Sequence, residues 1–139
     1  MLVLVKANIL AVGLGGRSNA LKVLPIRVVC MQTGVEAGRS LKNEHVDSVI
    51  SKWDLSDARD GRFLKNLRLA KPYMPVIAIV NSNDAGQEIA ARSIGAAAVL
   101  SSDVGDEVFR QTAIGVLGLD DAGTIQEICA IADDENRRV

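Results

Sequence analysis

Apolar runs alternate with amphipathic stretches along the chain, and this alternation predicts the secondary structure. Short runs dominated by Val, Ile, Leu and Ala are typical of strands, and they fall at Ile9–Val12, Ile26–Met31, Val46–Ser51, Pro75–Val80 and Ala97–Leu100. All of these runs except Val46–Ser51 are apolar at nearly every position rather than at alternate positions. They therefore indicate strands buried on both faces, as in a parallel sheet.

The stretches between these runs carry apolar residues at helical spacing. Helices are expected at Val35–His45, Arg59–Lys71 and Ala85–Ile94, and another is expected to begin at Asp103. Asn83 or Asp84 would cap the helix that Gly95 ends. The first crossover, residues 13–25, leaves room for about two helical turns.

The strictly alternating order predicts an α/β fold, a doubly wound five-stranded parallel sheet with helices on both faces. We expect one domain over residues 1–119. Residues 120–139 are expected to form a C-terminal helical extension, because Ile125, Ile128, Cys129 and Ala132 recur at helical spacing.

Composition narrows the classes of partner. Of the 139 residues, 24% are charged, yet the formal net charge is only -1, so strong attraction to nucleic acid or anionic lipid is not expected. Aromatic residues make up 3%, too few for a base-stacking surface. The apolar start, Met1–Val5, is followed closely by Lys6 and carries neither a spanning length nor a clear cleavage site. A cytoplasmic protein without membrane attachment is expected.

The residues that commonly ligate metals are sparse. Cys30, Cys129 and the single histidine, His45, have no spacing that suits a metal site, and no cofactor or metal is expected. Both cysteines are expected to be reduced thiols, with Cys30 buried within a strand.

Four segments, in the right order, resemble the response-regulator receiver (CheY-like) domain. Thr33–Leu41 is similar to the start of the family's second helix, and Val46–Gly61 is similar to its third strand and phosphorylation loop. Met74–Asp84 and Ile89–Asp103 resemble the fourth strand and the segment from the fourth helix through the fifth strand. The resemblance covers residues 8–119 and implies the flavodoxin-like fold of receivers.

The same resemblance implies that the phosphorylation machinery is missing. The acidic pair that holds Mg²⁺ in the family falls on Gly13 and Leu14, and the phosphorylated aspartate falls on Lys52 or, with a shift of one residue, on Trp53. The Ser/Thr position of the family falls on Val80, which Asn81 follows, and its Lys position falls on Ser102. The aromatic switch position of the fifth strand falls on Val99. The chain is therefore interpreted as a degenerate pseudo-receiver, without enzymatic activity, that signals or scaffolds by binding proteins.

Receivers bind partners and dimerise through their fourth and fifth helices and fifth strand. By resemblance, this surface, which would also serve a homodimer, is expected at Gln87, Ser93, Val99, Ser101, Phe109 and Ala113.

Two alternatives use other residues. A small-ligand sensor for phosphate or a nucleotide could use the glycine-rich segment after the first strand, which includes Gly13, Gly15, Gly16, Arg17 and Ser18. That segment lacks the full dinucleotide-binding fingerprint. A true phosphoacceptor at Asp54 ranks below it.

Three further features have a functional and a structural interpretation. Lys52 could pair with Asp54 or Asp57, or be the remnant of an unused site. Trp53 could be a contact anchor or simply packed. A basic series could dock an acidic partner or be a solvated helix face, which we favour; it comprises Arg59, Arg62, Lys65, Arg68 and Lys71.

Overall fold

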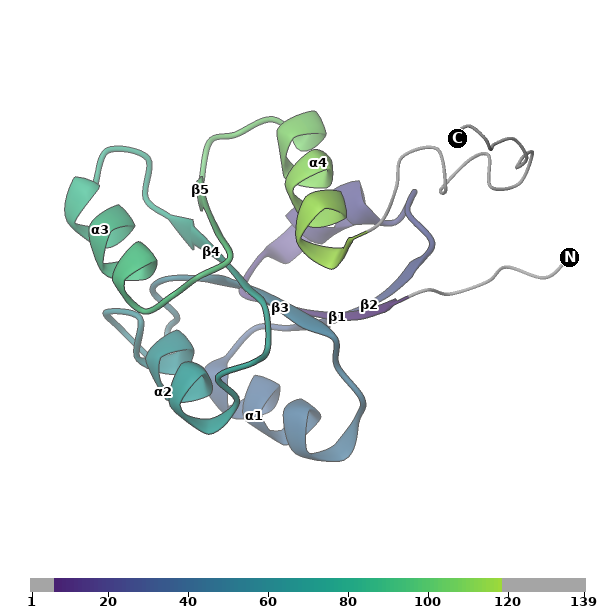
Figure 1. Cartoon of the computed structure of the whole chain (residues 1–139), viewed down its shortest axis with the longest axis horizontal. Helices are drawn as coiled ribbons and strands as arrows, with labels where there is room; N and C mark the ends of the chain where they lie inside the picture. The colour runs from purple at the N-terminus through teal and green to yellow at the C-terminus, as the bar shows by residue number, and fades with distance from the viewer. Residues whose placement is uncertain (1–6, 119–139) are drawn as a thin grey trace, which may run out of the picture.

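The computed structural model describes residues 7–118, which alternate between strands and helices (Figure 1). The strands are β1 (Ala7–Val12), β2 (Ile26–Met31), β3 (Ser48–Lys52), β4 (Val76–Val80) and β5 (Ala98–Ser101). The helices are the 3-10 helix η1 (Gly15–Leu21) and the α-helices α1 (Gly34–Asn43), α2 (Arg62–Ala70), α3 (Ala85–Ser93) and α4 (Asp106–Leu117).

All strand pairs are parallel, and the sheet order is β2-β1-β3-β4-β5. This is the doubly wound order of flavodoxin-like folds, in which sites lie beyond the carboxyl ends of the strands where the order reverses. The predicted fold class is confirmed. At that edge the ends of β1 and β3 are neighbours, with Val12 opposite Ser51.

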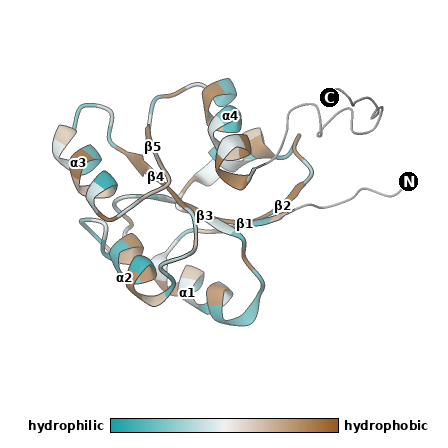
Figure 2. Ribbon diagram, viewed as in Figure 1, coloured by the Kyte–Doolittle hydropathy of each residue, from teal (hydrophilic) through white to brown (hydrophobic). Residues whose placement is uncertain are grey.

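Helices cover both faces of the sheet, and each face has its own hydrophobic core (Figure 1). One core lies under α1, α2 and α3 and contains Leu10, Val49, Phe63 and Leu64. The other lies under η1 and α4 and contains Phe109. Figure 2 shows hydrophobic and hydrophilic stretches on each turn of α1 and α2, as expected for helices that bury one side.

Several helix ends differ from the sequence-based expectation for local reasons. The second predicted helix begins at Arg62 rather than Arg59, because Asp60 (φ 55°) and Gly61 (φ 71°) adopt left-handed backbone conformations. The first ends at Asn43 rather than His45, because Glu44 is extended. The last begins at Asp106 rather than Asp103. Asp84 is the N-cap of α3 and accepts a hydrogen bond from the Gln87 amide, which confirms one of the two expected caps.

The shortened first crossover is a single 3-10 helix, η1, followed by a turn into β2. β2 is an edge strand, and for this reason Cys30 is exposed rather than buried, so the expectation for this thiol was wrong. The expected helix at 122–139 lies outside the described residues. Within residues 7–118 there is no helix long and apolar enough to cross a membrane.

Candidate functional site

The loops at the carboxyl edge of β1 and β3 meet where the resemblance places the phosphorylation site. Gly13 has a positive φ of 71°, and its amide donates a hydrogen bond to the Met31 carbonyl at 2.8 Å. A Cβ atom at Gly13 would lie 2.7 Å from Leu55 and 3.5 Å from Lys52 Cδ. Lys52, rather than Trp53, therefore lies beside the Gly13 turn, so the positions expected for a metal ligand and a phosphoacceptor are adjacent.

Neither position offers the chemistry that the family uses there. Gly13 and Leu14 provide no carboxylate, and Lys52 is exposed and cationic at neutral pH. Among residues 7–118, no group of three or more His, Cys, Asp or Glu side chains could hold a metal ion. The donor set at this edge does not suit Mg²⁺, which prefers carboxylate and other oxygen ligands.

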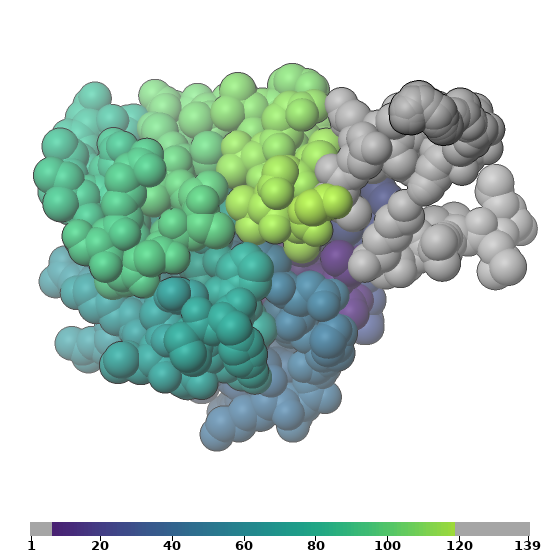
Figure 3. All heavy atoms as spheres, in the orientation of Figure 1, coloured from purple at the N-terminus to yellow at the C-terminus, as the bar shows by residue number. Residues whose placement is uncertain are grey.

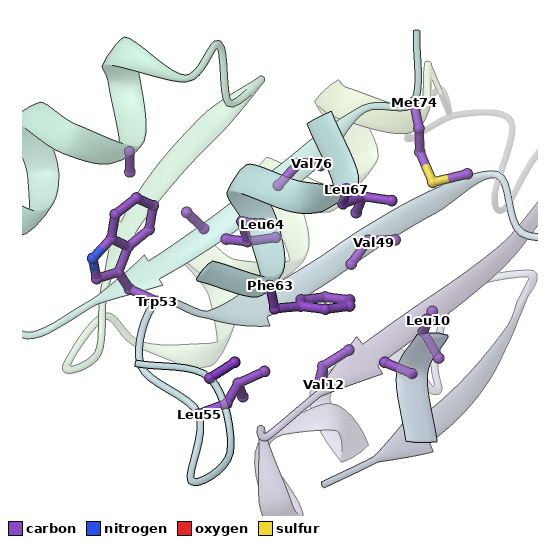
Figure 4. Close-up of a cluster of buried hydrophobic side chains, with 14 of the residues drawn as sticks. Leu10, Val12, Val49, Trp53, Leu55, Phe63, Leu64, Leu67, Met74 and Val76 are labelled. Atoms are coloured by element: carbon purple, nitrogen blue, oxygen red, sulfur yellow. The ribbon is translucent and has the colours of Figure 1, made fainter. Parts of the chain in front are cut away.

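Trp53, which follows Lys52, is a core residue. Its side chain is only 4% exposed and lies at one end of the buried cluster in Figure 4. The indole ring occupies the space beside Gly61, where a Cβ atom would approach the ring to 2.2 Å. The Lys65 ammonium lies 5.7 Å from the ring centre, within cation–π range. The contact-anchor interpretation of Trp53 was wrong, because burial leaves no free face for a partner.

Asp54 is the central acceptor of a short hydrogen-bond chain. One carboxylate oxygen accepts from the Asp60 amide at 2.6 Å, and the other accepts from Gln87 Nε2 at 3.1 Å. Gln87 Oε1 in turn accepts from the Asn81 amide at 2.9 Å. This Asp54–Gln87 chain joins the loop after β3 to the start of α3 and to the end of β4. Arg59 Nε lies 3.8 Å from the same carboxylate.

Asp57 binds the start of α1 rather than Lys52. Its two carboxylate oxygens accept from the Gly34 amide at 2.8 Å and the Val35 amide at 3.0 Å. The Gly34 bond, followed by the Val35 bond, lowers the pKa of Asp57. A carboxylate at a helix N-terminus also interacts favourably with the helix dipole. Thr33 and Glu36 form a capping box at the same terminus. The predicted pairing of Lys52 with Asp54 or Asp57 is thus replaced by contacts to other groups.

The glycine-rich segment after β1 is used internally. Its Arg17 guanidinium donates to the Ser102 carbonyl at 2.8 Å and to the Val104 carbonyl, and it lies 5.6 Å from the centre of the Phe109 ring. Ser18 is buried and donates to the Gly15 carbonyl at 3.3 Å. Gly15 and Gly16 have no atoms near their would-be Cβ positions. Because Arg17 is engaged with the β5–α4 loop, these contacts do not support the small-ligand interpretation.

The basic series does not form one docking face. Arg59 precedes α2 and approaches Asp54, Lys65 lies over Trp53, and Arg68 Nε donates to the Ile94 carbonyl at 3.0 Å. Arg62 is exposed at the start of α2, and Lys71 lies just after its end. The series therefore combines structural contacts with solvated positions.

The expected interface residues divide into two groups. Ser93 is exposed, Val99 and Ser101 are half-buried, and Gln87 is half-buried within the Asp54–Gln87 chain. Phe109 and Ala113 are fully buried against the sheet, so their assignment to a surface was wrong. The helical period explains the error, since the outward positions of α4 that neighbour them include Val108, which is 50% exposed. A cavity of about 310 Å³ opens between α3 and β5, lined by residues that include Val80, Asn81, Asp84, Glu88 and Val99.

Sequence reasoning missed the roles of Arg17 and Gln87. Arg17 acts across 85 residues of sequence, and Gln87 reaches Asp54 across 33 residues, so no local pattern indicates either contact. The one available signal was chemical. The Arg17 guanidinium, near the start of η1, suits carbonyl partners, and the Gln87 side-chain amide, near the start of α3, suits backbone or carboxylate partners.

Solved structures that share this fold are receiver domains. The receiver domain of an HD domain-containing protein from Pseudomonas fluorescens has a TM-score of 0.74 at 21% identity, covering 81% of this chain and 95% of that chain. A receiver protein from Burkholderia phymatum has a TM-score of 0.71 at 28% identity, covering 83% and 98%. The receiver domain of a Pseudomonas aeruginosa sensor histidine kinase, with magnesium coordinated in its active-site cleft, has a TM-score of 0.69 at 18% identity, covering 81% and 98%.

The chain therefore has the fold of receiver domains. No protein-family model matches the sequence, and no curated protein matches it either.

Proposed function

We propose that this chain is a pseudo-receiver, a non-enzymatic signalling or scaffolding module that is not phosphorylated and acts by binding protein. The observation that carries the proposal is that Gly13 and Lys52 lie next to each other at the carboxyl edge of the sheet. Phosphoryl transfer from a small donor requires a carboxylate nucleophile and a metal ion that neutralises the developing charge. This pair supplies neither.

The nearest carboxylate, Asp54, is a poor substitute for the missing acceptor. Both of its oxygens already accept hydrogen bonds, from Asp60 and Gln87, and Arg59 lies 3.8 Å away. A carboxylate whose two oxygens already accept hydrogen bonds is less available as a nucleophile. Phosphorylation would also require the Asp54–Gln87 chain to break.

The same chain supports a single dominant conformation. A receiver that switches needs a group that binds its two states differently. Here the polar and aromatic switch positions are Val80 and Val99, which cannot bind a phosphoryl group and have stiff side chains. Gln87 meanwhile ties the loop after β4 to Asp54 without any modification.

Protein binding is proposed for the face formed by α3, β5 and α4, which we call the α3–β5–α4 face. Its exposed apolar residues are Ile89 (65% exposed) and Val108 (50% exposed), and Ser93, Val99 and Ser101 lie on the same elements. A second copy of the chain is the partner that can be tested directly, since β5 is an edge strand of the sheet that residues 7–118 form.

The proposal that the site is inactive is tested with acetyl phosphate or beryllofluoride in the presence of Mg²⁺. The mass and the amide NMR spectrum of the full chain are expected to remain unchanged. A stoichiometric gain in mass that an Asp54→Ala variant abolishes would contradict the proposal and establish a phosphoacceptor.

The proposed face is tested by following amide shifts as the protein concentration is raised. Shifts are expected to concentrate on α3, β5 and α4, and Ile89→Asp or Val108→Asp should remove them. Val23→Asp, at an apolar residue that is 72% exposed outside this face, is the matched control and should leave them unchanged. Association that maps to another face would argue against this surface.

A further inference from the structure

An apolar groove lies between α1 and α2, on the side of the sheet opposite α4. Its volume is about 420 Å³, and its apolar lining includes Gly38, Leu41, Phe63, Leu67 and Ala70. Figure 3 shows the surfaces of α1, in blue, and α2, in teal, side by side in the lower part of the molecule. This groove plays no part in the site or the face described above.

Small residues keep the groove open. A Cβ atom at Gly38 would meet no other atom within 4 Å, although this glycine lies in the middle of α1 and faces α2. A glycine within a helix destabilises that helix relative to alanine. An open apolar groove with such a residue in its wall is suited to receiving another apolar surface.

We propose that the C-terminal segment Ile125–Ala132 of the same chain docks in this groove as an amphipathic helix. Ile125, Ile128, Cys129 and Ala132 follow the spacing i, i+3, i+4, i+7 and would form one apolar stripe. A free helix of this length is marginal in water, so it requires burial of that stripe to persist.

The chain is long enough to reach the groove. Every α-helix of the fold follows the carboxyl end of a strand and returns toward the opposite edge, so α4 ends at the same edge as α1 and α2. The groove's Leu41, Lys42 and Lys71 lie at those helix ends. Residues 119–124 can span about 20 Å when extended. Helices on opposite faces of a sheet are separated by about the same distance, since each layer adds about 10 Å.

Charge favours this groove over the other cavities. Its lining contains Lys42 and Lys71 and no acidic residue. Residues 119–139, which contain this segment, are acidic: their charged residues are Asp120, Asp121, Glu127, Asp133, Asp134 and Glu135 against Arg137 and Arg138. The cavity between α3 and β5 is instead lined by Asp84 and Glu88, which would repel it.

The direction of the segment along the groove matches the positions of the basic residues. The chain would enter the groove at the C-terminal ends of α1 and α2, where Asp120 and Asp121 would pass near Lys42 and Lys71. A helix over residues 125–132 would then be about 12 Å long, slightly shorter than α2, and would carry the acidic residues that follow it toward Arg62 at the start of α2. The segment would run antiparallel to both helices.

The test places a nitroxide spin label on the full chain at Ala130→Cys, in a Cys30→Ser, Cys129→Ala background. Position 130 lies off the apolar stripe and carries no charge. Amide signals of Gly38, Leu41, Asn66 and Ala70 are expected to lose most of their intensity, while those of α3 and β5 retain theirs. Unchanged intensities on α1 and α2, or losses concentrated on another face, would overturn the proposal.

Substitutions that block the groove, or that disrupt the apolar stripe of the segment, provide a second test. Gly38→Leu should restore the broadened signals by displacing the segment, and Ile125→Asp with Ile128→Asp should do the same. Gly115→Leu is the matched control, because Gly115 is also a helical glycine with open space at its Cβ but lies on α4. Persistent broadening in Gly38→Leu would exclude this groove. Broadening that appears only between labelled and ¹⁵N-enriched molecules in a mixed sample would overturn docking within one chain.

Discussion

The two loops that approach the phosphorylation position are held in place by different forces. The loop after β3, residues 53–61, places Trp53, Leu55 and Ala58 in the core, and the carboxylates of Asp54 and Asp57 accept from backbone amides and Gln87. In the segment after β1, residues 13–19 include no buried apolar side chain. This segment is anchored by Arg17, whose guanidinium donates to two carbonyls beyond β5.

The difference indicates two ways of holding a loop at this edge of the sheet. In the loop after β3, carboxylates accept from neighbouring amides, and an indole fills the adjacent core. In the segment after β1, the Arg17 cation connects the shortened crossover to the opposite loop. We therefore expect the first loop to depend mainly on apolar packing and the second mainly on hydrogen bonds.

The largest effect is expected from Trp53→Ala. Truncation of a buried aromatic side chain typically costs about 3–5 kcal/mol, through lost burial and the cavity that remains. Urea unfolding followed by circular dichroism measures this change in the free energy of unfolding. A loss below about 1 kcal/mol would show that the loop after β3 does not depend on its indole.

Gly61→Ala tests the same contact from the opposite side. It adds a methyl group where the Trp53 ring lies and strains a residue whose φ is 71°, so it should also destabilise the protein. Gly16→Ala is the matched control in the other loop, because a Cβ atom there meets nothing within 4 Å.

An intermediate effect is expected from Arg17→Ala. Loss of hydrogen bonds from a charged, half-buried guanidinium should lower the free energy of unfolding by about 1–2 kcal/mol. Amide exchange should accelerate in the loop containing Ser102 and Val104, with little change in the loop after β3. Arg27→Ala is the control, since Arg27 lies on the exposed edge strand and its ion pair with Glu44 spans 3.9 Å. Equal effects of the two variants would remove the proposed role of Arg17.

The smallest effect is expected from Asp57→Asn, and it should depend on pH. The Gly34 and Val35 amides lower the pKa of Asp57, so its carboxylate stabilises the fold at pH values above about 4. That contribution is lost as the pH falls through the lowered pKa. The melting temperature of the native protein should exceed that of the variant at pH 7, and the gap should close as the pH falls below the lowered pKa of Asp57. A gap that is independent of pH would indicate lost packing rather than lost charge.

The fold was largely predictable because its signals are local. Continuous apolar runs such as Val76–Val80 and the capping residue Asp84 each have a physical cause within a few residues. Helix limits were less predictable, because they depended on single backbone conformations such as the positive φ at Asp60.

The site was only partly predictable. The mapping of the family's positions onto Gly13 and Lys52 used residue order alone, and the structure brings those two together. Exposure was the main source of error: Cys30 is exposed because β2 is an edge strand, and Phe109 is buried because α4 turns it toward the sheet. Both depend on how the strands are ordered and how each helix is rotated, and neither is encoded within a short window of sequence.

The position of Trp53 has a practical consequence. It is the only tryptophan, it is buried in the loop after β3, and the Lys65 ammonium lies over its ring. The intrinsic fluorescence of the protein therefore reports on a single place, the loop that in a receiver would respond to phosphorylation. The protein carries its own optical probe there, so the emission maximum and quenching can follow any disturbance of that loop without an added dye.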